Sequence, residues 1–319
     1  MKLNQGIFLK IVSTFMMGTS VFAGPLQLSG SVKVDGSSTV FPISEAIAEE
    51  FQKVHGSVKV TVGVSGTGGG FKKFAHGEID ISGASRPISE TEKNAAKENK
   101  IQFVEIPVAI DGLTVMVNPK NDWVTSITVE ELKKIWQPQS TVKLWSDVRE
   151  TWPKRKMNLY GPGTDSGTFD YFTEVVVGKA KASRPDYTAS EDDNVLVQGI
   201  SGDRDALGYL GYSYYKENKE RLKSLGISDG KNPPVFPSDE TILKGIYKPL
   251  SRPLFIYVNK GALGRPEIEK FVNFYVTKAT ALVPEVGYVP LSQTKYDEVL
   301  KRFEDAKTAK YDVTMKDLL

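Results

Sequence analysis

Residues 31–54 decide the fold of this protein; they read SVKVDGSSTVFPISEAIAEEFQKV. Val32 and Val34 alternate with polar residues, which is typical of a strand with one buried face. From Pro42 to Val54 the apolar residues recur at helical spacing, and Pro42 stands early, where its missing N–H costs no hydrogen bond. The stretch therefore predicts a strand, a short turn rich in Ser and Thr, and a helix.

The same unit repeats twice downstream. A strand at 57–64 leads through SGTGGG (65–70) into a short helix containing Phe71 and Phe74, and a strand at 79–81 leads through residues 82–87 into a helix at 89–99. Strands that alternate with helices predict a parallel sheet, whose ligands lie beyond the carboxyl ends of the strands. We therefore expect the three turns to share one edge of the sheet.

Two similar apolar strands, LTVMVNPK (113–120) and LFIYVNK (254–260), bracket the middle of the chain. They predict that the chain crosses twice between two lobes, with hinges around 110–113 and 251–255. We expect an α/β fold with a ligand cleft between the lobes, in which lobe 1 comprises residues 24–111 and 252–319 and lobe 2 comprises residues 112–251. Further helices are predicted at 129–136, 166–177, 194–200 and 266–276, and further strands at 158–160 and 206–212.

The N-terminus carries export signals. Lys2 and Lys10 precede an apolar run from Ile11 to Phe22, and the small residue Ala23 stands before Gly24. This pattern predicts a secretory signal peptide over residues 1–23, cleaved after Ala23, and hence a periplasmic protein. The alternative is a membrane anchor, but the run is shorter than the roughly 20 apolar residues that a spanning helix needs.

The amino-acid composition excludes several kinds of partner and of chemical site. The chain has 41 Lys and Arg against 39 Asp and Glu, so without Lys2 and Lys10 the balance is 39 of each, and we expect no nucleic-acid partner. The absence of cysteine excludes disulfides, thiolate zinc sites and cysteine nucleophiles. The only histidines, His55 and His76, each precede a glycine and are interpreted as exposed turn residues. We expect neither a metal nor a cofactor.

The segment GPGTDSGTFDYF (161–172) allows two interpretations. The order Asp165-Ser166-Gly167-Thr168 matches an aspartic-protease signature, whereas a glycine-rich turn before a helix is an anion-binding site. A protease needs two such aspartates that share a proton, and a chain of this length should carry both copies. Only one copy is present, and a helical pattern follows it, so the anion interpretation is favoured.

An anion site needs donors from several loops, and the chain offers them. Helix starts near 38–40, 67–69 and 166–168 supply unpaired backbone N–H groups, and glycines allow close approach. Arg86 supplies a planar fork that fits an oxyanion. N-capping alone explains any single loop, but not why both lobes repeat the feature. The hydroxyl candidates are Ser38, Thr39, Ser65, Thr67, Ser166 and Thr168.

Asp165 adds selectivity to this hypothesis. A carboxylate repels a fully ionised anion but accepts a hydrogen bond from a protonated one, so it favours phosphate over sulfate near neutral pH. Asp35 and Asp111 are alternative candidates for this role, and a simple N-cap is the alternative explanation of Asp165.

Four segments resemble the periplasmic phosphate-binding protein of phosphate ABC importers: DGSSTVFP (35–42), SGTGGGF (65–71), GASRP (83–87) and DSGTF (165–169). The resemblance implies two lobes that close on one phosphate. It implies binding by Ser38, Thr39 and the backbone of Val40, by Thr67 and Gly68, and by Ser166, Gly167 and Thr168. In the family an acid follows Gly-Ala-Ser and an arginine precedes Ser-Gly-Thr; here Arg86 and Asp165 stand in the exchanged positions.

We therefore expect a monomeric, non-enzymatic protein that captures inorganic phosphate and delivers it to the membrane permease of an ABC importer. One alternative is a binding protein for another tetrahedral oxyanion, such as sulfate, molybdate or arsenate. A second is a phosphatase or a phosphate-sensing adhesin on the same scaffold, although no cysteine or clustered carboxylates support a hydrolytic centre.

Overall fold

The computed structural model describes residues 28–164, 166–190 and 192–319. The predicted signal peptide and its cleavage site lie outside these residues. No helix in the described part of the chain is both long and apolar enough to cross a membrane.

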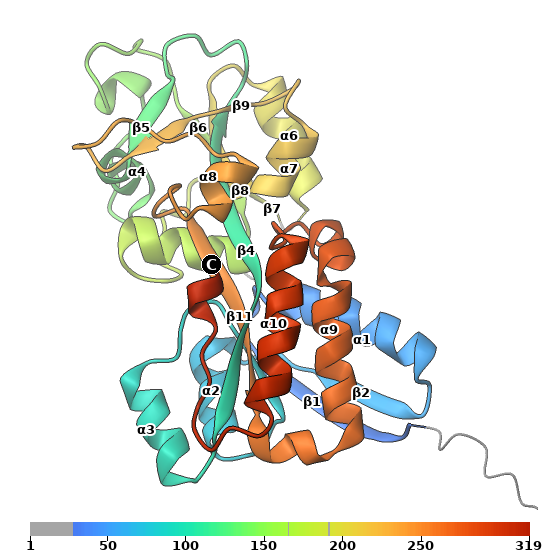
Figure 1. Ribbon diagram of the computed structural model, residues 1–319. Helices are drawn as coiled ribbons and strands as arrows, with labels where there is room; N and C mark the ends of the chain where they lie inside the picture. Colours follow the sequence, from blue (N-terminus) through green and yellow to red (C-terminus); the bar gives the residue numbers. More distant parts are fainter. Residues whose placement is uncertain (1–27, 165, 191) are drawn as a thin grey trace, which may run out of the picture.

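Lobe 1 is built from the repeated strand–helix units that the sequence predicts (Figure 1). Strand β1 pairs in parallel with β2 and β3, with Val32 opposite Val60 and Val34 opposite Ile81. The glycine run at 66–70, expected as a loop, is instead the first half of a helix. The elements are β1 (Gly30–Gly36), α1 (Phe41–Val54), β2 (Val58–Val62), α2 (Gly66–Ala75), β3 (Ile81–Ala84) and α3 (Glu90–Glu98).

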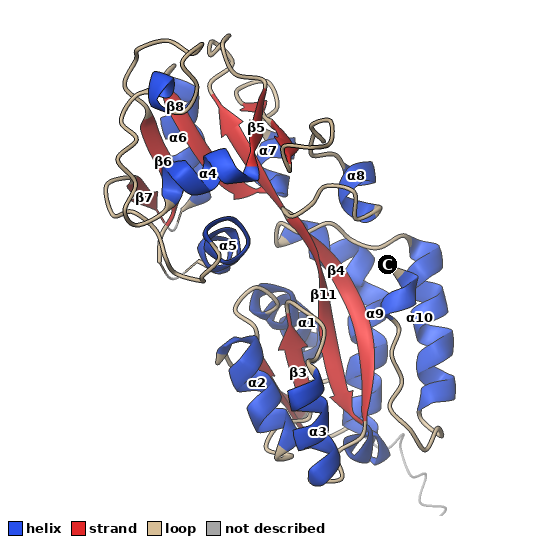
Figure 2. Ribbon diagram, turned by 90° about the vertical axis from the view of Figure 1, so that its left-hand side faces the viewer, coloured by secondary structure: helices blue, strands red, loops and turns tan. Residues whose placement is uncertain are grey.

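Two long strands connect the lobes, as Figures 1 and 2 show. Strand β4 (Phe103–Val117) is buried along its whole length, and β11 (Ser251–Asn259) runs antiparallel to its first part. The end of β4 continues into lobe 2, where Leu113 lies opposite Gly211 of strand β8. The sequence predicts only the second part of β4, because charged residues and a proline interrupt the apolar pattern before residue 112.

Lobe 2 contains a second part of the same sheet, in the order β4-β8-β6-β7, and a separate two-stranded sheet, β5-β10. The helix predicted at 166–177 is present, but it becomes a π-helical turn after Phe172. The elements are β5 (Ser126–Thr128), α4 (Val129–Trp136), η1 (Trp145–Asp147), β6 (Asn158–Pro162), α5 (Gly167–Phe172), η2 (Thr173–Val177), β7 (Thr188–Ser190), α6 (Asp193–Gly202), β8 (Ala206–Gly211), α7 (Tyr212–Glu217), β9 (Lys223–Ser224), β10 (Gly226–Ser228) and α8 (Asp239–Leu243).

The C-terminal segment returns to lobe 1. Helices α9 (Pro266–Glu285) and α10 (Gln293–Ala306) follow the short turn η3 (Lys260–Gly264), and η4 (Lys316–Leu318) ends the chain. Tyr275 of α9 hydrogen-bonds Ser44 of α1 at 3.0 Å between their hydroxyl oxygens. Helix α9 is nine residues longer than predicted, and α10 is absent from the sequence-based prediction.

Buried aromatic residues fix helix α5 in lobe 2. Trp136 packs edge-on against Phe172 and Tyr209, and the rings of Phe172 and Tyr209 stack with centroids 3.6 Å apart. All three side chains are essentially inaccessible to solvent. Because packing density is high in such a core, the position of α5 relative to the sheet is strongly constrained.

Candidate functional site

The starts of helices α1, α2 and α5 meet where the two lobes face each other (Figure 2). Gly167, at the start of α5, lies against Thr39 in the turn before α1: a Cβ atom added to Gly167 would stand 2.9 Å from Thr39 Oγ1. The N-termini of two helices from opposite lobes are therefore brought together.

A cavity of about 410 Å³ opens on one side of this contact, and we call it the arginine-lined cavity. Five predicted site residues line it: Ser38, Thr39, Thr67, Gly68 and Arg86. The hydroxyl groups of Thr67 and Ser85 lie 3.1 Å apart, so the second and third loops of lobe 1 are in contact.

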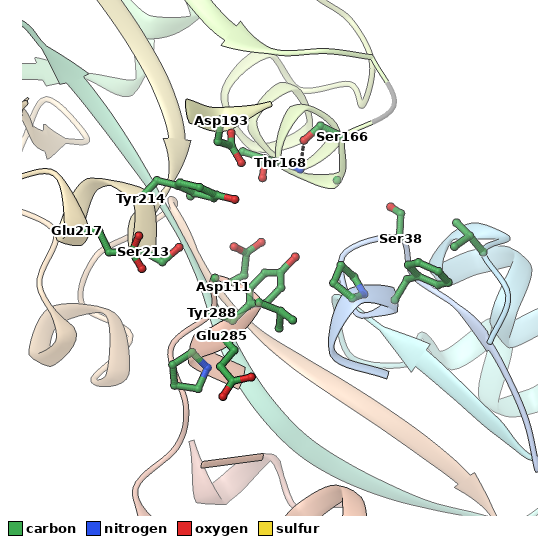
Figure 3. A pocket seen from close by; sticks show the side chains of 18 residues that line it. Ser38, Asp111, Ser166, Thr168, Asp193, Ser213, Tyr214, Glu217, Glu285 and Tyr288 are labelled. Atoms are coloured by element: carbon green, nitrogen blue, oxygen red, sulfur yellow. Dashed lines mark hydrogen bonds between the residues drawn. The ribbon is translucent and has the colours of Figure 1, made fainter. Parts of the chain in front are cut away.

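A second cavity, of about 620 Å³, opens on the other side, and we call it the carboxylate-lined cavity (Figure 3). Ser166, Gly167 and Thr168 line it from lobe 2, and Ser38 lines it from lobe 1. The predicted residues are therefore divided between two neighbouring cavities, and Ser38 belongs to both. Acidic side chains also border this cavity, at Asp111, Asp193, Glu217 and Glu285.

Two of the predicted residues that the structure describes, Val40 and Ser65, line neither cavity. Val40 is fully buried, and its N–H donates to the carbonyl of Ser37 at 3.2 Å. Ser65 Oγ donates to Asp35 Oδ1 at 2.6 Å. Asp165 lies outside the described residues. The first two residues thus stabilise the loops behind the cavities in this structure.

Arg86 is held by an anchored carboxylate. Its Nη1 and Nη2 atoms each donate to Glu92 at 2.9 Å. Glu92 in turn accepts from Ser89 in the capping box at the start of α3. Burial opposes ionisation of Glu92, but the hydrogen bonds from Arg86 and Ser89 outweigh it and lower the pKa of this carboxyl. Arg86 therefore reaches the cavity from a fixed, charge-compensated position.

The two described acids that were considered as proton acceptors have different environments. Asp35 is bonded to Lys73 Nζ at 2.6 Å as well as to Ser65. Asp111, on β4, is buried, and its Oδ2 atom accepts a hydrogen bond from Arg252 Nε at 3.3 Å. Burial raises the pKa of Asp111, although the charge of Arg252 acts in the opposite direction.

Arg252 is a candidate site residue that the sequence analysis missed. It is the second residue of β11, at the junction of the lobes, and it lines the arginine-lined cavity. Its Nη2 donates to Thr39 Oγ1 at 2.9 Å, and its guanidinium carbon lies 3.7 Å from the ring centroid of Tyr171. The available signal was a charged residue beside a proline, at the start of the apolar run LFIYV.

The described residues contain no cluster of three or more His, Cys, Asp or Glu that could hold a metal ion. Backbone N–H groups, hydroxyls and two arginines therefore make up the polar chemistry of the arginine-lined cavity, with Asp170 and Glu174 at its border. Such donors bind an anion without forming or breaking covalent bonds.

The sequence and the fold are similar to those of known binding proteins. A profile of the PBP superfamily domain matches residues 23–279. The crystal structure of a possible phosphate binding protein from Planctomyces limnophilus has a TM-score of 0.84 at 53% identity, covering 88% of this chain and 99% of that one. An ABC-type phosphate transport receptor from Vibrio cholerae, at 23% identity and a TM-score of 0.64, shares the fold.

Curated relatives cover nearly the same length. Protein SphX of Synechocystis is 48% identical over 299 residues, which is 93% of this chain and 88% of SphX. The phosphate-binding protein PstS of Staphylococcus haemolyticus is 36% identical over 309 residues, 92% of this chain and 95% of PstS.

The chain therefore belongs to the PBP superfamily of two-lobed binding proteins. Within it, the chain belongs to the family that contains SphX and PstS. These findings confirm the resemblance drawn from the four sequence segments and the two-lobe α/β fold. They also confirm that the chain is a binding protein rather than an enzyme.

Proposed function

We propose that this protein captures inorganic phosphate between its lobes and delivers it to the membrane permease of an ABC importer. The names of the PstS relatives and of the Planctomyces structure support phosphate as the ligand. The extracytoplasmic place of such receptors supports a periplasmic location, which the predicted signal peptide would provide. We propose that the protein acts as a monomer.

The contact between Thr39 and Gly167 carries the proposal. It brings a helix start of lobe 1 to within contact distance of a helix start of lobe 2, beside two arginine side chains. An anion bound there collects backbone N–H donors from both lobes, and the low dielectric of a closed cleft strengthens each charge-assisted bond.

The ligand set follows from this position. We propose that Ser38 and Thr39 bind from the first loop, and that Thr67, Gly68 and Arg86 bind from the second and third loops. Ser166, Gly167 and Thr168 bind from lobe 2. Val40 and Ser65 support the loops through the contacts described above.

Asp111 is our candidate for the acid that selects protonated phosphate. It is buried and faces the carboxylate-lined cavity, whereas Asp35 is occupied by Lys73 and Ser65. A buried carboxylate without enough donors penalises sulfate, which brings no proton to share. Asp165 remains the alternative acid.

Lobe closure supplies the transport signal. We propose that lobe 1 comprises residues 24–111 and 252–319, that lobe 2 comprises residues 112–251, and that the hinges lie near 110–113 and 251–255. These positions coincide with the stretch where β4 and β11 pair and leave lobe 1, with Ser251 opposite Gly112. Hinge closure around a ligand is a common switching motion, and a permease can read it.

Calorimetric titration of the ligand-stripped protein with phosphate and with sulfate at neutral pH tests the function. We expect one-to-one phosphate binding and no heat from sulfate. Equal binding of sulfate would favour a general oxyanion receptor. The absence of a binding heat with both anions would refute the proposal. Release of phosphate from a phosphate ester by the purified protein would instead indicate a phosphatase.

A further inference from the structure

Arg252 contacts both lobes at once, which distinguishes it from Arg86. It touches Thr39 of lobe 1 through Nη2 and the ring of Tyr171 in lobe 2 through its guanidinium face. Its Nε atom lies 3.3 Å from Asp111 on the connecting strand β4. Among the hydrogen bonds of the described residues none involves Nη1, and the side chain is only 13% exposed.

Tyr171 is itself firmly placed. It lies on α5, immediately before Phe172 of the aromatic core, and is only 3% exposed. Its hydroxyl donates to the carbonyl of Pro249 at 2.6 Å. A guanidinium that lies flat on an aromatic ring keeps its N–H groups directed outward in one plane. The ring therefore fixes the plane of the Arg252 fork.

We infer that Arg252 is a second anion-binding residue, and that Tyr171 is a positioning residue that couples this arginine to lobe 2. The inference rests on the proposed function and extends it. A bound anion holds the guanidinium in its position beside Thr39 and the cavity. Because the guanidinium is also stacked on Tyr171, helix α5 is held with it, and the Ser166-Gly167-Thr168 turn stays beside the ligand.

Three substitutions and one control separate the effect of the planar guanidinium geometry from the effect of its charge. Arg252→Lys keeps the charge beside buried Asp111 but loses the planar fork and most of the stacking. Tyr171→Leu removes the ring without changing any charge, while Tyr171→Phe keeps the ring and loses only the hydrogen bond to Pro249. Arg204→Lys is the control, because the Arg204 guanidinium carbon also lies over an aromatic ring, 5.3 Å from the ring centroid of Trp123, but Arg204 lines neither cavity.

The test combines phosphate titration, thermal melting and small-angle X-ray scattering with and without saturating phosphate. We expect Arg252→Lys to raise the Kd for phosphate at least tenfold and Tyr171→Leu to raise it severalfold. We expect Tyr171→Leu to reduce the phosphate-induced compaction as well. Tyr171→Phe and Arg204→Lys should retain wild-type affinity and compaction.

The outcomes distinguish the inference from the function on which it rests. Wild-type binding together with unchanged Kd values in Arg252→Lys and Tyr171→Leu would overturn the inference alone. No phosphate binding by the wild type would overturn both proposals. If Arg252→Lys melts below the assay temperature, the charge-neutral pair Tyr171→Leu and Tyr171→Phe decides the question.

Discussion

Gly167 illustrates how one side chain can determine whether the lobes meet. A Cβ atom at this position would lie 2.9 Å from Thr39 Oγ1 and 3.3 Å from the Thr39 backbone nitrogen. Real Cβ atoms do not approach other atoms so closely without displacing them, and Thr39 is buried. A methyl group here must therefore push the lobes apart or twist the turn before α1.

We predict that Gly167→Ala weakens phosphate binding by at least tenfold, or about 1.4 kcal/mol, with little loss of thermal stability. Calorimetric titration measures the affinity. Gly202→Ala is the control, because a Cβ atom there meets nothing within 4 Å. An unchanged Kd in Gly167→Ala would mean that the two helix starts do not need to touch in the bound state.

Asp111 is the residue where selectivity can be tested. We predict that Asp111→Asn admits sulfate, because the amide removes the negative charge that repels a fully ionised anion. Titration with sulfate and phosphate measures the ratio of the two affinities, which should fall at least tenfold.

Asp35→Asn is the matched control for this substitution, since Asp35 is paired with Lys73 behind the cavities. Sulfate should give no binding heat with the control variant. If sulfate also gives no binding heat with Asp111→Asn, another acid selects the ligand, and Asp165 becomes the next residue to replace.

The sequence suggested one kind of candidate site residue and named Asp111 as an alternative acid, but it missed Arg252 and the pairing of these two residues. Ser38 and Arg86 stand in loops within three residues of a glycine, and Thr67 stands in a glycine run, so a local pattern in the sequence indicates all three. Arg252 and Asp111 are 141 positions apart, and only the antiparallel pairing of β4 with β11 brings them together. No local pattern reports such a pairing, so a buried charge pair of this kind requires the fold.

At the scale of elements, helix α2 shows why glycines occur where they are unfavourable. Gly costs roughly 0.5–1 kcal/mol relative to Ala in a helix, yet α2 begins with a run of them. A Cβ atom on Gly70 would lie 2.6 Å from Gly36 Cα and 2.8 Å from Ser82 Oγ. The glycine therefore lets α2 pack directly on β1 and β3.

We predict that Gly70→Ala destabilises the protein by about 1–3 kcal/mol, the usual cost of overpacking. Gly68→Ala should be neutral or stabilising, because its Cβ atom would meet only Arg86 Nη2, at 4.0 Å. Denaturant unfolding compares the two. Equal stabilities would contradict the close packing of α2 on the sheet.

Uniform periodicity made some elements predictable, but it was not sufficient for all of them. Helix α4 occupies the predicted residues 129–136, because its apolar spacing and its capping residues coincide. Helix α10 was missed although its buried positions Tyr296, Val299 and Phe303 keep helical spacing. For β4 the signal was weaker, because Glu105 and Asp111 are buried charged residues that hydropathy assigns to the surface.

At the scale of the molecule, acid should weaken the fold through its anchored carboxylates. Burial opposes ionisation of Asp35, Glu92 and Glu131, but hydrogen bonds from Lys73, Arg86 and Arg149 outweigh it and lower each pKa. A lowered folded-state pKa contributes stability above the unfolded value, about 4, and that stability is lost as pH falls through the folded value.

We predict that the melting temperature falls as the pH is lowered below about 4.5, and that Glu131→Gln flattens part of this fall. Melting curves between pH 3 and pH 7 measure the effect. Glu78→Gln serves as the control, since no ion pair of Glu78 is found among the described residues. An identical pH profile in Glu131→Gln would show that its pair with Arg149 is not linked to stability.

Strand β4 makes the two lobes one cooperative unit. All 15 of its residues are buried, and it pairs with β11 in the lobe 1 part of the sheet and with β8 in the lobe 2 part. If either lobe unfolds and β4 leaves its part of the sheet, the strand is also disturbed in the other lobe, and buried residues there become exposed. We therefore predict a single calorimetric unfolding transition rather than one for each lobe.

Phosphate should raise the midpoint temperature of this single unfolding transition. A ligand at 100 times its Kd that binds only the folded state stabilises it by about 2.7 kcal/mol, and the contact of both lobes with the ligand spreads this stabilisation over the molecule. Differential scanning calorimetry with phosphate, and with sulfate as the control, measures the shift. Two separate transitions, of which phosphate moves only one, would mean that the ligand is bound by a single lobe and that β4 does not couple the two.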